Sequence, residues 1–101
     1  MKLGKMAEQL AQQYLKDNNY EIIGTNIRDN KIEIDIIARH GDLIVIVEVK
    51  SRKSLSWFQI QKQQKTNINN FIMKHYGDQY VRIDLLLICD KKIHHMKNIY
   101  L

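Results

Sequence analysis

Apolar residues recur at helical spacing in two stretches of the chain. In the first, about residues 4–18, a period near 3.6 predicts an amphipathic helix. Its apolar stripe consists of Leu3, Ala7, Leu10, Ala11 and Tyr14. The second stretch covers about residues 57–76 and shows the same spacing. The pattern therefore predicts two helices separated by a long non-helical segment.

Between and after these helices lie stretches rich in isoleucine, valine and leucine, which favour strands. We expect strands at about residues 20–28, 31–39, 43–50, 80–89 and 93–100, with a loop over about residues 51–56. The element order is then αβββαββ, which predicts an α/β sandwich: a central mixed sheet flanked by helices. No repeat or linker divides the chain, so residues 1–101 are expected to form a single domain.

A two-residue hairpin turn at Gly41-Asp42 sets the register of the two central strands. Glycine in the first loop position suits a type II′ turn. Paired residues then have numbers that sum to 83, which places Asp35 opposite Glu48 and Glu33 opposite Lys50. Because side chains alternate between faces, these four share one face of the hairpin. The other face is expected to hold Ile34, Ile36, Ala38, Val45, Val47 and Val49.

The carboxylates of Asp35 and Glu48 lie within strongly apolar strands, where opposed like charges are destabilising. A divalent cation such as Mg²⁺ or Mn²⁺ would hold them together, because it prefers oxygen ligands. Lys50, two residues after Glu48, is placed to orient a water or to stabilise charge on a phosphate. The pattern therefore favours metal-assisted phosphodiester hydrolysis. The alternative is a set of partly exposed salt bridges, as Glu33 and Lys50 alone would form.

The composition of the chain limits the classes of protein to which it can belong. The single cysteine, Cys89, excludes an intramolecular disulfide framework and favours a reducing, cytoplasmic compartment. No apolar run approaches the length of a membrane span, and no signal peptide is recognisable. The formal net charge is +5, and no acidic residue occurs between Glu48 and Asp78. The basic residues of that stretch are Lys50, Arg52, Lys53, Lys62, Lys65 and Lys74. They favour a nucleic-acid partner. The alternative is that they form a solvated helix face.

The sequence contains Asp35 and, after twelve intervening residues, Glu48-Val49-Lys50. This arrangement resembles the PD-(D/E)xK signature of the restriction-endonuclease-like superfamily. Further motifs along nearly the whole chain resemble the YraN family of small bacterial endonuclease-like proteins. They include Ala7-Glu8-Gln9-Leu10-Ala11, Asn26-Ile27-Arg28, Glu33-Ile34-Asp35-Ile36-Ile37-Ala38 and Val47-Glu48-Val49-Lys50-Ser51-Arg52. Archaeal Holliday-junction resolvases share the core layout.

The resemblance implies an αβββαβ core, a metal-dependent endonuclease-like site that uses Mg²⁺ or Mn²⁺, and DNA as substrate. By position, Glu8, Asp35, Glu48 and Lys50 match the catalytic residues, with the three acids as metal ligands. Nucleic-acid contacts are expected from Arg52, Lys53, Lys62 and Lys65. Cutting of both strands, or of a junction, would favour a homodimer.

Two departures from the family pattern keep other readings open. Ile32 stands where the family usually has glycine, and the segment after Lys50 is shorter than in relatives. A chain without that loop fits a non-catalytic nucleic-acid-binding or partner-recruiting module, and RNA is an alternative substrate. Asp84 is expected to be structural or to pair with a nearby cation, and the neighbouring histidines His94 and His95 are not expected to share one metal.

Overall fold

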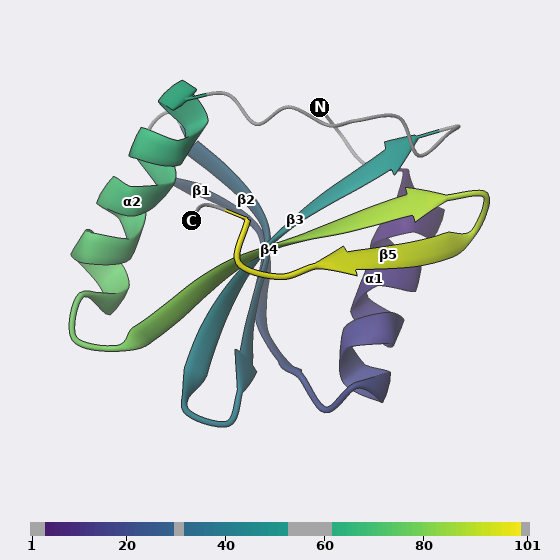
Figure 1. Ribbon diagram of the computed structural model, residues 1–101, viewed down its shortest axis with the longest axis horizontal. Coiled ribbons are helices and arrows are strands. Elements are labelled where there is room, and N and C mark those ends of the chain that lie inside the picture. The colour runs from purple at the N-terminus through teal and green to yellow at the C-terminus, as the bar shows by residue number, and fades with distance from the viewer. Residues whose placement is uncertain (1–3, 30–31, 53–61, 100–101) are drawn as a thin grey trace.

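The computed structural model describes residues 4–29, 32–52 and 62–99, without the side chains of residues 52 and 62–66. Its elements follow the predicted order αβββαββ (Figure 1). They are α1 (Lys5–Asp17), β1 (Glu21–Asp29), β2 (Ile32–His40), β3 (Leu43–Arg52), α2 (Lys62–Tyr76), β4 (Tyr80–Cys89) and β5 (Lys92–Met96). Within the described residues, no helix is long and apolar enough to cross a membrane.

The five strands form one mixed sheet in sequence order, β1-β2-β3-β4-β5. Only β3 and β4 run parallel, because α2 carries the chain back across the sheet between them. The two helices cover opposite faces, as Figure 1 shows. This arrangement confirms the predicted fold class and is compatible with an αβββαβ nuclease-like fold.

The central strand β3 faces both helices, and its alternation divides the core in two. Val45, Val47 and Val49 pack in a cluster with α1, whose Ala11 and Leu15 are fully buried. Ile44 and Ile46 lie on the other face, in a cluster that includes residues of α2. A strand that is apolar on both faces is typical of a sheet covered on both sides, and this explains why β3 reads as a continuous apolar run.

The predicted hairpin register is confirmed near the turn and fails beyond it. Paired residues sum to 83 from His40↔Leu43 to Ile36↔Val47, and Gly41 has the positive φ of 62° that a type II′ turn needs. The ladder does not extend to Asp35, so the predicted direct pairing of Asp35 with Glu48, and of Glu33 with Lys50, is wrong. The strands separate here because the Asp35 carboxylate accepts the backbone N–H of Val49.

The prediction for Ile34 is also wrong. Ile34 packs in the α2 cluster with Ile32 and Ile37, whereas Ile36 packs in the α1 cluster. Residues two apart on a regular strand share a face, so β2 changes face at Asp35. Opposite Asp35, between the pairs Thr25↔Ile36 and Ile27↔Ile34, Asn26 of β1 has a left-handed φ of 51°, whereas the register shift of this ladder lies nearer its start, between Ile22 and Gly24.

Two predicted boundaries differ from the observed ones by more than one residue, and a third falls outside the described residues. Residues 51–52 belong to β3 and not to the loop, because β4 continues to pair with them. The described part of the second helix begins at Lys62, and residues 57–61 lie outside the described residues. The last strand ends at Met96, because Asn98 adopts a φ of 59° and Ile99 donates its N–H to the carbonyl of Ile83. The chain there turns back over β4.

Candidate functional site

Asp35 lies where β2 changes face and the β2–β3 ladder ends. The N–H of Val49 donates a hydrogen bond of 2.8 Å to Asp35 Oδ2. A backbone donor that would otherwise face the neighbouring strand is thereby satisfied by a side chain. The Asp35 carboxylate is consequently fixed in the gap between β2 and β3, and both the main chain and the side chain define its position.

Glu48 and Lys50 reach the same gap from β3. Both lie on the α2 side of β3, because they alternate with Val47 and Val49 of the α1 cluster. Lys50 Nζ lies 3.4 Å from Glu48 Oε1, with side-chain exposures of 20% and 8%. Asp35 and Glu48 line one small pocket. The structure thus brings Asp35, Glu48 and Lys50 together, although by a different geometry from the predicted cross-strand pair.

The remaining wall of this pocket includes Glu33, on the rim, and apolar residues of α2 and β4, Ile68 and Ile83. Glu33 is partly exposed and lies 3.8 Å from the guanidinium of Arg28. The pocket is therefore acidic at one side and hydrocarbon at the other. Because Glu48 in this acidic site is only 8% exposed, the attraction of a cation or of a positively charged donor is stronger here than at the open surface.

The electrostatics of Asp35 follow from this position. Burial raises the pKa of the Asp35 carboxyl above its usual value, and the negative charge of Glu48 raises it further. The hydrogen bond from Val49 and the charge of Lys50 oppose the rise in pKa but do not cancel it. A carboxyl whose pKa is raised by burial and by a neighbouring carboxylate is a feature that clusters at functional sites.

Two carboxylates of the pocket, Asp35 and Glu48, are the residues that could hold Mg²⁺ or Mn²⁺. No group of three or more His, Cys, Asp or Glu side chains in the described part of the chain is arranged to hold a metal. Mg²⁺, however, usually keeps several waters and binds through one or two carboxylates together with substrate phosphates. Asp35 and Glu48 supply such a pair, and a bound cation would relieve the repulsion between their charges.

Glu8, the third predicted metal ligand, lies on α1 and is not in the pocket. Its Oε1 accepts a hydrogen bond of 2.8 Å from Asn26 Nδ2. Asn26 lies between the β1 residues that pair with Ile36 and Ile34, and it has a left-handed φ of 51°. Glu8 is therefore held beside the strand that flanks the site. Its predicted role as a metal ligand stays a prediction.

The contact of Asn26 with Glu8 beside the site was not predicted from the sequence. The Asn26-Ile27-Arg28 motif gave a signal, but the motif alone does not reveal a left-handed backbone. Of the predicted nucleic-acid contacts, Lys53 lies outside the described residues. The side chains of Arg52, Lys62 and Lys65 lie outside them too, and their roles stay predictions.

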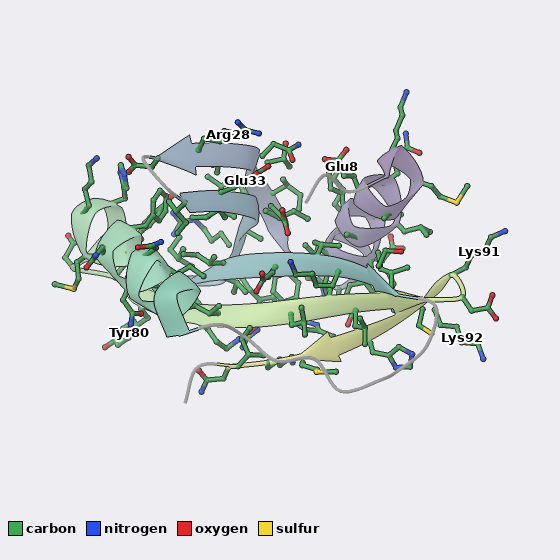
Figure 2. All side chains as sticks on the ribbon, turned by 90° about the horizontal axis from the view of Figure 1, so that it is seen from above. Glu8, Arg28, Glu33, Tyr80, Lys91 and Lys92 are labelled. Atoms are coloured by element: carbon green, nitrogen blue, oxygen red, sulfur yellow. The ribbon has the colours of Figure 1, made fainter. Side chains whose placement is uncertain are left out.

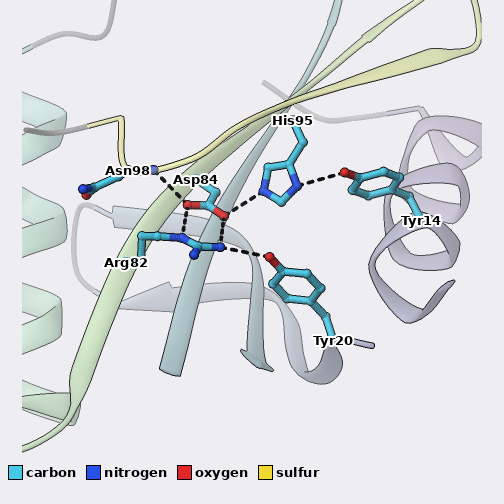
Figure 3. A network of polar contacts seen from close by, with 6 residues as sticks. All are labelled: Tyr14, Tyr20, Arg82, Asp84, His95 and Asn98. Carbon is cyan, nitrogen blue, oxygen red and sulfur yellow. Dashed lines mark hydrogen bonds and ion pairs between the residues drawn. The ribbon is translucent and has the colours of Figure 1, made fainter. Parts of the chain in front are cut away.

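A second polar cluster lies on the α1 face of the sheet (Figure 3). Asp84 is fully buried and accepts two hydrogen bonds of 2.8 Å from Arg82. His95 Nε2 lies 2.7 Å from Asp84 Oδ2, and the N–H of Asn98 donates to Oδ1 at 3.0 Å. Asp84 is thus paired with a nearby cation and tied to its surroundings, as the sequence predicted.

Two tyrosines extend this cluster. The Tyr20 hydroxyl accepts a hydrogen bond of 2.9 Å from Arg82, and the Tyr14 hydroxyl lies 2.9 Å from His95 Nδ1. Arg82 and the hydrogen bonds to Asp84 lower the pKa of the Asp84 carboxyl, although its burial acts in the opposite direction. The cluster joins α1, β4, β5 and the chain after β5, and every described group in it has a partner. We therefore assign it to stability.

Comparison with known proteins supports the family resemblance. The model of the uncharacterised protein family UPF0102 matches residues 7–88. A UPF0102 protein from Thermodesulfovibrio yellowstonii is 38% identical over 108 aligned positions, which cover 99% of this chain and 96% of the relative. Because this chain has 101 residues, at least seven of those positions have no counterpart in it.

Other relatives are similar along nearly their whole length. A UPF0102 protein from Alkaliphilus metalliredigens is 34% identical, with 97% of this chain and 96% of the relative covered. One from Aquifex aeolicus is also 34% identical, with 95% of this chain and 94% of the relative covered. The chain therefore belongs to the uncharacterised protein family UPF0102, the YraN family that its motifs resemble.

Proposed function

We propose that this protein is a divalent-metal-dependent endonuclease that hydrolyses phosphodiester bonds in DNA. The observation that supports this proposal is the convergence of Asp35, Glu48 and Lys50 where the β2–β3 ladder ends. Asp35 and Glu48 would hold Mg²⁺ or Mn²⁺. When bound, such a metal supplies Lewis-acid stabilisation of a phosphoryl oxygen and makes a water more acidic.

The protein side chains have separate tasks in this proposal. The hydrogen bond from Val49 fixes the Asp35 carboxylate, so that ligand orientation costs little when the cation arrives. Glu48 would supply the second carboxylate for the cation, and its Oε1 lies 3.4 Å from the Lys50 ammonium. Lys50 donates hydrogen bonds and positive charge next to the pocket, where it orients an attacking water or stabilises charge on the phosphate. The apolar side of the pocket limits bulk water.

Cleavage of labelled DNAs tests this function. Duplex, single-stranded, flap and four-way-junction DNAs are incubated with Mg²⁺, Mn²⁺ or EDTA and with the wild-type protein or the variant Lys50→Ala. We expect metal-dependent cleavage that falls at least 100-fold in the variant. Lys92→Ala removes an exposed lysine of β5 and serves as the matched control, with unchanged cleavage. Equal cleavage by the wild-type protein and Lys50→Ala would contradict the assignment.

A non-catalytic nucleic-acid-binding module is the second candidate. It is favoured by the position of Glu8, which is bonded to Asn26 and does not join Asp35 and Glu48 in the pocket. This candidate predicts salt-sensitive DNA binding without cleavage under any metal. The same panel of DNAs, measured for binding in EDTA and for cleavage with metal, separates the two functions. An RNA panel tests the remaining alternative substrate, and sedimentation tests whether a homodimer forms.

A further inference from the structure

A groove of about 330 Å³ lies between the end of β1 and the C-terminal half of α2. Apolar side chains in its lining include Ile27, Ile37 and Phe71, of which Ile37 and Phe71 are buried. Three basic residues, Arg28, Lys74 and His75, also line it. A concave surface that combines hydrocarbon with a few polar groups is the usual form of a ligand site.

Two permanently charged cations, Arg28 and Lys74, line this groove together with one carboxylate, Asp29. Lys74 Nζ lies 3.2 Å, and His75 Nε2 3.0 Å, from the same oxygen, Asp29 Oδ2. Hydrogen bonds from His75 and Lys74 lower the pKa of the Asp29 carboxyl, so Asp29 is charged at neutral pH. One carboxylate therefore faces two bases. Lys74 keeps 60% of its side chain exposed and is accessible to an anion.

Arg28 adds a second exposed cation at the other side of the groove. Its side chain is 72% exposed, and its guanidinium lies 3.8 Å from the half-exposed carboxylate of Glu33. An exposed pair at this distance contributes little to stability. Arg28 can therefore exchange Glu33 for an incoming phosphate with little loss, and a guanidinium is well suited to phosphate oxygens.

The residues that line the groove are direct neighbours of residues that line the candidate site. Ile27 and Arg28 of the groove pair with Ile34 and Glu33 of the pocket in the β1–β2 ladder. On α2, Phe71 of the groove lies one turn after Ile68, which lines the pocket. Figure 2 shows Arg28 and Glu33 on the same side of the molecule, on neighbouring strands.

From this proximity and charge, we propose that the groove binds the sugar–phosphate backbone of the DNA strand next to the bond held at the Asp35–Glu48 site. The placement of DNA at that site rests on the proposed function. Arg28 and Lys74 contact phosphates, and the apolar lining contacts deoxyribose. A ribose 2′-hydroxyl placed against Ile27 and Phe71 would be buried without a partner, which is unfavourable. The groove therefore prefers DNA to RNA.

Binding in EDTA tests the groove without any cleavage. Fluorescence anisotropy gives the Kd for a labelled single-stranded DNA between 50 and 200 mM salt. Lys74→Ala and Arg28→Ala should each weaken binding several-fold and reduce the slope of log K against log salt by about 0.7, the value for one lost single-strand phosphate contact. Lys16→Ala, on α1, removes an exposed lysine elsewhere and should change neither quantity. The proposal fails if the two groove variants match Lys16→Ala.

A variant that strengthens binding excludes simple structural damage. Asp29→Asn removes the charge that neutralises Lys74, so DNA affinity should rise several-fold. Asp90→Asn makes the same change of net charge in the exposed β4–β5 turn and should leave affinity nearly unchanged. An equal rise in both variants would assign the effect to net charge and overturn the proposal. An RNA of the same sequence should bind several-fold more weakly, and equal affinity would overturn the preference for DNA.

Failure of the groove and failure of the proposed function are distinguishable. If the wild-type protein cuts no DNA but Lys74→Ala still changes the salt slope, the nuclease proposal is contradicted and the groove proposal is supported. If the wild-type protein cuts DNA but Lys74→Ala binds DNA like Lys16→Ala, the nuclease proposal is supported and the groove proposal is overturned. Far-UV circular dichroism of each variant confirms that it is folded before its affinity is compared.

Discussion

Replacement of Asp84 by alanine is expected to destabilise this protein more than any exposed substitution. Asp84 is fully buried, and its two oxygens accept hydrogen bonds from Arg82, His95 and the backbone of Asn98. The substitution leaves all of these donors without their acceptor. It also leaves the Arg82 guanidinium, only 21% exposed, without its counter-charge.

The magnitude follows from the loss of one partner of a buried ion pair, which costs about 3–5 kcal/mol. A sum over four separate charged hydrogen bonds would give about 6–12 kcal/mol, which overshoots because the bonds are coupled. A chain of this length has a free energy of unfolding of about 5–15 kcal/mol. Asp84→Ala therefore removes a large share of the total, but the variant is expected to fold at low temperature.

Urea unfolding followed by far-UV circular dichroism measures the effect. With a slope of about 1–3 kcal/mol per molar urea, the midpoint should fall by at least about 1 M. Asp90→Asn is the matched control in the exposed turn after the same strand and should change stability by less than about 0.5 kcal/mol. Arg82→Met added to Asp84→Ala should restore part of the loss, because the unpaired guanidinium is removed.

The pH dependence has a defined sign. The pKa of Asp84 is lower in the folded protein than its ordinary value, so its contribution to stability is complete above that ordinary value. It is lost as the pH falls through the folded-state pKa. The difference between wild type and Asp84→Ala should therefore shrink in acid. A midpoint shift below about 0.3 M at pH 7, or a difference that grows in acid, would refute the reasoning.

The remaining predictions concern the site. Asp35→Asn should abolish metal-dependent cleavage and raise the free energy of unfolding at pH 7 by about 0.5–2 kcal/mol, since it removes a buried charge that Glu48 repels. Because the pKa of Asp35 is raised on folding, this gain should shrink as the pH falls through that pKa, and urea unfolding at several pH values measures it. Asn26→Ala, at a φ of 51°, should cost about 1–2 kcal/mol in thermal unfolding. Asn26→Gly, which also lacks the amide that holds Glu8, should retain most of that stability, and an equal loss in both variants would contradict the strain argument.

Local patterns in the sequence determined most of the architecture. Periods of 3.6 and 2 predicted the helices and strands, and α2 between β3 and β4 follows from their order. The turn at Gly41-Asp42 fixed the register of the central hairpin over the five pairs next to it. These features depend on residues close in sequence, so a single chain is enough to infer them. The register also indicated that Asp35, Glu48 and Lys50 lie close together, although the direct pairing that it predicted for Asp35 and Glu48 is absent.

The tertiary structure decided where regular pairing stops. A period-2 pattern assumes a continuous ladder, and nothing local shows that the Asp35 carboxylate replaces a strand partner by accepting the N–H of Val49. For the same reason the sequence placed Ile34 on the wrong face. The left-handed Asn26 and its hydrogen bond to Glu8 join residues eighteen positions apart. Such contacts depend on how α1 packs against the sheet.

The cluster around Asp84 shows most clearly which features the sequence predicts and which only the tertiary structure determines. The sequence indicated that Asp84 is structural or pairs with a nearby cation. It did not reveal that His95, Tyr14 and Tyr20 complete the set, since Tyr14 and His95 are 81 positions apart. Local periodicity therefore determines which side chains are buried. Only the folded arrangement of α1, β4 and β5 determines which donor meets which acceptor, because hydrogen bonds depend on distance and direction in space.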